Sequence, residues 1–130
     1  MYGFSIQLSS PSFEALIQRV TDALREEGFG VLADIDVQAT LRNKLGVERL
    51  PYRILGACNP PLAKRAIEAE PDIGLLLPCN VVVRQEASGD YVVAFMDPLP
   101  VLGLVQKAEL EELGREVRAR LQRVCAALTA

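Results

Sequence analysis

The chain has 130 residues, 50% hydrophobic and 24% charged, which is enough to bury one core without disulfides or metals. Its net charge of −3 argues against nucleic-acid binding, which requires a basic surface. The absence of histidine excludes Ser-His-Asp and Cys-His arrangements within one chain and removes the commonest transition-metal ligand. We therefore expect a single domain over residues 1–130, with no cofactor and no metal.

The N-terminal third predicts a strand, a helix and a second strand. Apolar residues alternate from Tyr2 to Leu8, which is the period of a strand. Ser10 is the expected N-cap of the following helix, with Pro11 in its first turn and Gly28 at its end. The next strand is expected to carry these residues on one face: Val31, Ala33, Ile35 and Val37.

The middle of the chain continues with a short helix, a third strand and a second long helix. The short helix ends at Gly46, and the strand covers residues 52–58. Asn59 is the expected N-cap of a helix that begins at Pro60 and stops before Pro71.

A hairpin and a long helix complete the chain. Two apolar strands flank a turn that contains Gly89, and the prolines at 98 and 100 end the second strand. From about Ala108 a helix carries one apolar stripe: Leu110, Leu113, Val117, Leu121, Val124 and Leu128. Gly114 interrupts this helix, which indicates that another segment packs closely there.

The resulting order is β-α-β-β-α-β-β-α, with an extra short helix between the second and third strands. Strands and helices do not alternate strictly as βαβ units. This order favours an α+β fold with one mostly antiparallel sheet and helices packed on one face.

Three segments resemble a family of bacterial and archaeal proteins called domain of unknown function 302. They are VLADIDVQATLRNKLG, LGACNPPLAKRAIEAEPDIGLLLPCNVVV and FMDPLPVL. The resemblance covers about Tyr2 to Leu102, and its marks are Asp36, Cys58-Asn59-Pro60, Leu77-Pro78-Cys79 and Asp97-Pro98. It implies a curved antiparallel sheet similar to the TATA-binding-protein-like group, found as dimers. It implies no DNA function and supplies no catalytic residues.

Two cysteines flank the second long helix and form the first candidate site. Cys58 lies just before the helix N-terminus, where the helix dipole favours a thiolate, and Cys79 opens the next strand. They lie at opposite ends of the helical connection, so the sequence does not establish that they meet. The pair is either a redox or thiolate site, or two small apolar side chains that fill the boundary between sheet and helix.

Four polar residues at the junctions of strands and helices form the second candidate site. Asp36, Asn59 and Asp97 each have a structural alternative, as a helix cap or a turn former. Asn80 precedes three valines, where asparagine is a poor strand former, so it is the residue for which we most expect a ligand or loop contact.

The apolar connector Leu99–Val105, together with the C-terminal helix, is the expected surface of a homodimer, unless the connector is buried within its own chain. No run approaches the roughly 20 apolar residues that cross a bilayer, and no signal peptide is present. With three cysteines, an odd number, we expect a cytoplasmic protein without structural disulfides and without a membrane partner.

Three functions are compatible with these features. The first is a small dimeric module that binds a ligand or a protein partner, without catalysis. The second is a thiol-dependent redox enzyme or sensor that uses Cys58, Cys79 or both. The third is a structural accessory subunit.

Overall fold

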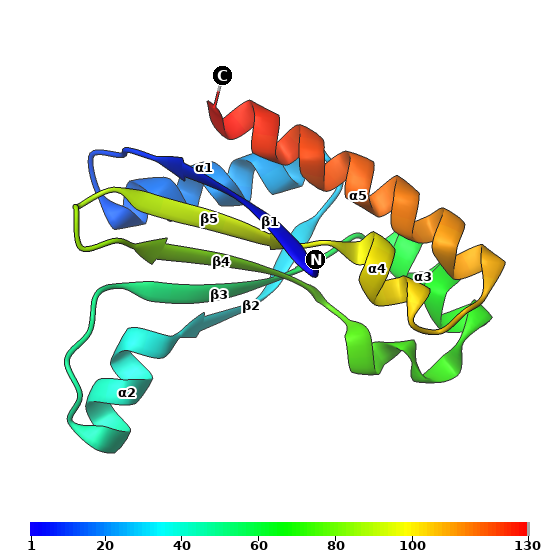
Figure 1. Cartoon of the computed structure of the whole chain (residues 1–130), viewed down its shortest axis with the longest axis horizontal. Coiled ribbons are helices and arrows are strands. Elements are labelled where there is room, and N and C mark those ends of the chain that lie inside the picture. Colours follow the sequence, from blue (N-terminus) through cyan, green and yellow to red (C-terminus); the bar gives the residue numbers. More distant parts are fainter. Residues whose placement is uncertain (130) are drawn as a thin grey trace.

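The computed structural model describes residues 1–129 and contains a five-stranded antiparallel sheet with strand order β1-β5-β4-β3-β2 (Figure 1). The strands are β1 (Gly3–Leu8), β2 (Gly30–Asp36), β3 (Tyr52–Cys58), β4 (Cys79–Gln85) and β5 (Tyr91–Met96). The helices are α1 (Phe13–Glu26), α2 (Val37–Leu45), α3 (Pro60–Ala69), α4 (Pro98–Gly103) and α5 (Ala108–Thr129), with a 3₁₀ helix η1 (Pro71–Leu76). The α+β class and the antiparallel sheet are confirmed, whereas the TATA-binding-protein-like grouping stays a prediction.

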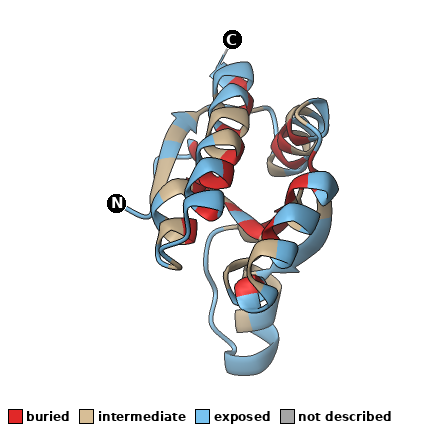
Figure 2. Ribbon diagram, turned by 90° about the vertical axis from the view of Figure 1, so that its right-hand side faces the viewer, coloured by how far each residue is buried: buried red, intermediate tan, exposed pale blue. Residues whose placement is uncertain are grey.

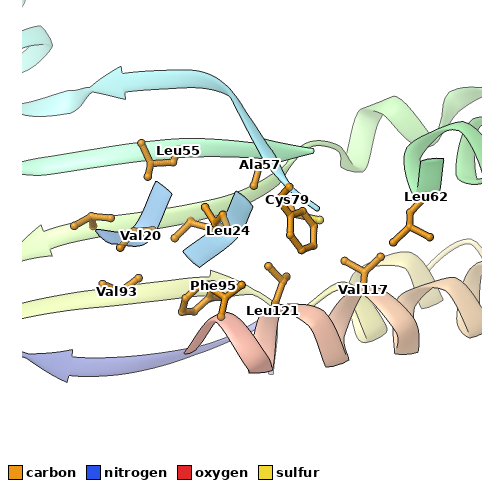
Figure 3. Close-up of a cluster of buried hydrophobic side chains, with 14 of the residues drawn as sticks. Val20, Leu24, Leu55, Ala57, Leu62, Cys79, Val93, Phe95, Val117 and Leu121 are labelled. Atoms are coloured by element: carbon orange, nitrogen blue, oxygen red, sulfur yellow. The ribbon is translucent and has the colours of Figure 1, made fainter. Parts of the chain in front are cut away.

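The hydrophobic core lies between one face of the sheet and the helices α1 and α5 (Figure 3). All six residues of the predicted α5 stripe are buried, and α1 contributes Leu16, Val20 and Leu24, which are inaccessible to solvent. The buried residues of the helices face the centre of the molecule (Figure 2). Within residues 1–129, no helix combines the length and the apolar character that crossing a membrane requires.

The start of α1 differs from the prediction by one serine. Ser12, not Ser10, is the N-cap, because the Ser12 Oγ accepts a hydrogen bond from the Ala15 N–H at 3.1 Å. The Ser10 hydroxyl donates to the Ser12 carbonyl instead, so Pro11 precedes the cap and lies outside the first turn.

A β-bulge at Leu32 makes the predicted face of β2 wrong. Val31 pairs with Ala57 and Ala33 pairs with Gly56, so the register shifts between these two residues of β2. Because neighbouring residues of β3 point to opposite faces, Val31 and Ala33 also point to opposite faces. The bulge leaves the Leu32 side chain 71% exposed at the sheet edge.

The aspartates of β2 have separate partners. Arg53 of β3 donates two hydrogen bonds of 2.7 Å to the Asp34 carboxylate and lies 3.0 Å from Glu14 of α1. The hydrogen bonds from Arg53 hold the pKa of Asp34 below its ordinary value. The cluster joins β2, β3 and α1 through the side chain of Arg53.

The connector after β5 forms the helix α4. Asp97 caps this helix and Pro98 occupies its first position, where no backbone N–H is required. A Cβ atom at Gly114 would lie 3.0 Å from the Pro98 carbonyl oxygen and 3.1 Å from the Leu99 Cα. The close packing predicted at Gly114 is therefore confirmed, and α4 is the segment that packs there.

The helix α2 lies apart from the other helices. It extends from the end of β2, and none of its residues is buried (Figure 1). Its strongest contacts are with β3. The remaining helices leave the opposite face of the sheet open, so the sheet has one face in the core and one that carries exposed side chains such as Ser5 and Asn80.

Candidate functional site

A hollow of about 390 Å³ lies where the ends of β3 and β4 meet α3, α4 and α5. Its floor is buried, since Ala57 is inaccessible and Leu113 is 3% exposed. At its rim, Leu32 is 71% exposed and Ile67 is 49% exposed. None of the lining residues, all of them within the described chain, carries a charge. The hollow is therefore an apolar pocket with access to solvent.

The sequence of α3 explains why space remains here. The helix presents to the hollow the short side chains of Ala63 and Ala66 between the larger Leu62 and Ile67. Small residues leave volume between a helix and the elements that it faces. The opposite wall comes from α5, where Leu113 and Val117 belong to the predicted apolar stripe.

The structure brings Cys58 and Cys79 to the same hollow. The strands β3 and β4 are neighbours, and Cys79 pairs with Ala57, the residue before Cys58. The connection through α3 and η1 therefore leaves the sheet and returns to the adjacent strand. Both thiols are free, and no cluster of three or more potential metal ligands occurs among residues 1–129.

Cys79 is the more buried of the two thiols. Its side chain lies on the helix-covered face of the sheet, near Ala57 (Figure 3), and the residue is 7% exposed. Burial, and to a smaller extent the neighbouring Cys58, raise the pKa of the Cys79 thiol to about 11. At neutral pH Cys79 is accordingly a neutral thiol, and it is a poor nucleophile.

We predict that the alkylation rate of Cys79 by iodoacetamide rises about tenfold per pH unit from pH 7 to pH 10. Only the thiolate reacts, and the thiolate fraction grows by that factor below the pKa. Peptide mapping by mass spectrometry follows Cys79 separately from Cys58 and Cys125. The denatured chain is the control and should level off near its ordinary pKa of 9.0. A plateau below pH 9 in the folded protein would contradict the assignment.

Asn59 is both the N-cap of α3 and a wall of the hollow. Its Oδ1 accepts a hydrogen bond of 3.5 Å from Leu62 N–H, and its Nδ2 donates to the Glu27 carbonyl at 3.4 Å. The Arg120 guanidinium donates to the same carbonyl at 3.1 Å. The predicted cap is confirmed, and Asn59 also fixes the start of α3 to the end of α1.

Asn80 lies on the opposite face of the sheet from Cys79, because consecutive strand residues alternate. It lines a second hollow of about 420 Å³ on the open face, formed by β1, β4 and β5. Tyr2, which is 80% exposed, borders this hollow. Cys79 and Asn80 therefore border two different hollows and cannot act on one ligand. The expected ligand contact of Asn80 stays a prediction.

Asp36 and Asp97 line neither hollow. The Asp36 carboxylate caps α2 by accepting from the Ala39 N–H at 2.9 Å. The Asp97 carboxylate caps α4 by accepting from the Leu99 N–H at 3.1 Å, and it lies 3.2 Å from Arg118 Nε. Both residues therefore have structural roles, which were the alternatives that the sequence left open.

Sequence reasoning missed most of the walls of the hollow. Leu113 and Val117 appeared only as core residues of the last helix, and Leu32 was not singled out. The available signal was the pair of alanines on the apolar face of α3. Their short side chains leave space between this helix and the elements that it faces. The partners of that surface, however, depend on the tertiary fold.

The fold and the site define a small α+β protein whose sheet borders a pocket lined by apolar side chains and two thiols. The chain belongs to the family described as "Domain of unknown function DUF302", whose model matches residues 4–128. The crystal structure of an uncharacterized conserved protein DUF302 from Bacillus stearothermophilus is similar, with a TM-score of 0.89, 30% sequence identity and 98% of each chain covered. No curated protein matches the chain. The predicted family is thus confirmed, and the function of this family is unknown.

Proposed function

We propose that this protein is a binding module that holds a small apolar molecule in the hollow beside α3. The observation that supports this most is the hollow itself, whose volume of about 390 Å³ is in the range of small-molecule pockets. Its floor consists of side chains with little or no solvent access, and its rim carries exposed apolar residues. Binding would remove apolar surface of both the ligand and the pocket from water. This burial is the main source of affinity in such pockets.

Three of the six candidate residues from the sequence belong to the proposed site. Cys58, Asn59 and Cys79 line the hollow. Asp36 and Asp97 act through the helices that they cap, so we assign them no contact with the ligand.

The uncharged fluorescent probe N-phenyl-1-naphthylamine tests this proposal. We expect it to bind with one site per chain, and we expect Ala63→Phe to weaken binding at least about tenfold, because the phenyl ring would occupy the hollow. Ala126→Phe, on the exposed side of α5, is the matched control and should bind the probe like the wild type. Thermal melts establish that both variants fold. Equal binding by Ala63→Phe and the wild type would exclude this hollow as the site.

A thiol-dependent activity is the second candidate, because two thiols line one hollow. Burial disfavours Cys79 as the attacking group, so this candidate depends on Cys58. If iodoacetamide reacts with Cys58 only after the protein is unfolded, a thiol-dependent activity is excluded. The third candidate, an accessory subunit, has no supporting contact in the described residues.

A homodimer and a cytoplasmic location stay predictions. Within the expected interface segment, Leu102 is 3% exposed and packs in the core, so it is not available to a partner. Leu104 is 72% exposed and Pro100 is exposed as well, so a second copy could contact these two residues of the segment. The three free thiols are compatible with a reducing compartment.

A further inference from the structure

The hollow has few polar side chains, namely one amide and two thiols, and the amide is already engaged. Asn59 has the only side-chain amide in the lining, and its oxygen and nitrogen both have backbone partners. Cys79 is a neutral thiol below about pH 10, because burial raises its pKa to about 11. Among the residues that the structure describes, the walls offer no counterion to a charged ligand.

The two cationic residues of α3, which lie in sequence between the lining residues Ala63 and Ala66, form ion pairs with other groups. Lys64 forms an ion pair with Glu68, and Arg65 lies 3.4 Å from Glu116. Arg120 of α5 donates from Nη1 to the Glu27 carbonyl and its Nη2 lies 3.6 Å from Glu116, while its buried Nε has no hydrogen-bond partner among the described residues. A carboxylate or phosphate that entered the hollow would lose its water shell without gaining an ion pair, which disfavours binding strongly.

We infer that the hollow selects uncharged molecules, with an apolar body and at most one neutral polar group, and rejects carboxylates and phosphates that have the same body. This inference rests on the proposed function, since it names the ligand class of the same site. It follows from the charge-free lining and from the paired state of the nearby cations. Alcohols, ketones and esters of medium chain length belong to the accepted class.

A pair of probes with the same chain tests the inference. Octan-1-ol and octanoate have equal chain lengths, and at pH 8 only octanoate is charged. We expect octan-1-ol to displace N-phenyl-1-naphthylamine at a concentration at least about 30-fold lower than octanoate. Equal displacement by both would overturn the inference and leave the proposed function intact. Failure of both probes and of the dye to bind would overturn the proposed function, and the inference with it.

A charge placed at the rim gives an independent test. Ile67 lines the hollow and is 49% exposed, so Ile67→Lys adds a cation there without burying it. We expect this change to improve octanoate binding at least about tenfold relative to octan-1-ol. Leu45→Lys is the matched control, because Leu45 is 70% exposed on α2 and does not line the hollow. The inference is wrong if both variants keep the wild-type preference, or if both change it equally.

Discussion

Asp97→Ala is expected to lower the free energy of unfolding by about 2–3 kcal/mol, with a fall in melting temperature of roughly 10 °C. Loss of the cap of α4 accounts for about 1 kcal/mol. The remainder comes from Arg118, which keeps its charge but loses its carboxylate partner at 3.2 Å. This second contribution is smaller than that of a fully buried ion pair, because the Arg118 side chain is 40% exposed to solvent.

The effect should be large because Asp97 joins three elements. It is 7% exposed, it ends β5, it caps α4 and it contacts α5. Asp36→Ala provides the control, since Asp36 also caps a helix but forms no ion pair with any residue of 1–129, and α2 has no buried residue. Urea unfolding should show a loss of about 1 kcal/mol for Asp36→Ala. Equal losses in the two variants would mean that the contact with Arg118 contributes nothing.

Gly28→Ala is the second substitution for which we expect a large loss, again about 2–3 kcal/mol. Gly28 has a φ of 86°, a left-handed conformation that alanine adopts only at a cost of about 1–2 kcal/mol. A Cβ atom here would also lie 2.9 Å from Asn59 Nδ2. The Asn59 side chain would have to move, and it would lose hydrogen bonds to Glu27 and Leu62.

Gly46→Ala separates the backbone effect from the steric effect. Gly46 has a φ of 66°, and nothing lies within 4 Å of the position of its Cβ. It should therefore lose only the backbone part, about 1 kcal/mol. If chemical denaturation gives the same loss for both glycines, the close approach of Asn59 to Gly28 is not a constraint on the fold.

Local sequence patterns were sufficient for most of the fold. The stripe on α5 and the caps at Asn59 and Asp36 depend on residues within one or two turns, so they can be read directly. The predicted N-cap of α1 was wrong because Ser10 and Ser12 are equally good caps by residue type. The bulge at Leu32 was missed because apolar residues on both sides of it allow either alternation.

The candidate site was less predictable, because it depends on which strands become neighbours. Cys58 and Cys79 line the same hollow only because α3 and η1 return the chain to the adjacent strand. Asn80 lies on the other face because consecutive residues of β4 alternate, but which hollow each face borders depends on the tertiary fold. Leu113 and Val117 reach the hollow from α5, more than 30 residues beyond Cys79, and their helical stripe is the same as that of any core helix.

The most direct test of the account is a titration of the methyl-labelled protein with octan-1-ol, followed by NMR. If the hollow beside α3 is the binding site, the methyl signals of Leu62, Leu113 and Val117 should shift together and saturate at one molecule per chain. The signals of Val82 and Ala94, on the open face of the sheet, should remain unchanged. Shifts confined to Val82 and Ala94, or no saturable shift at any methyl group, would contradict the account.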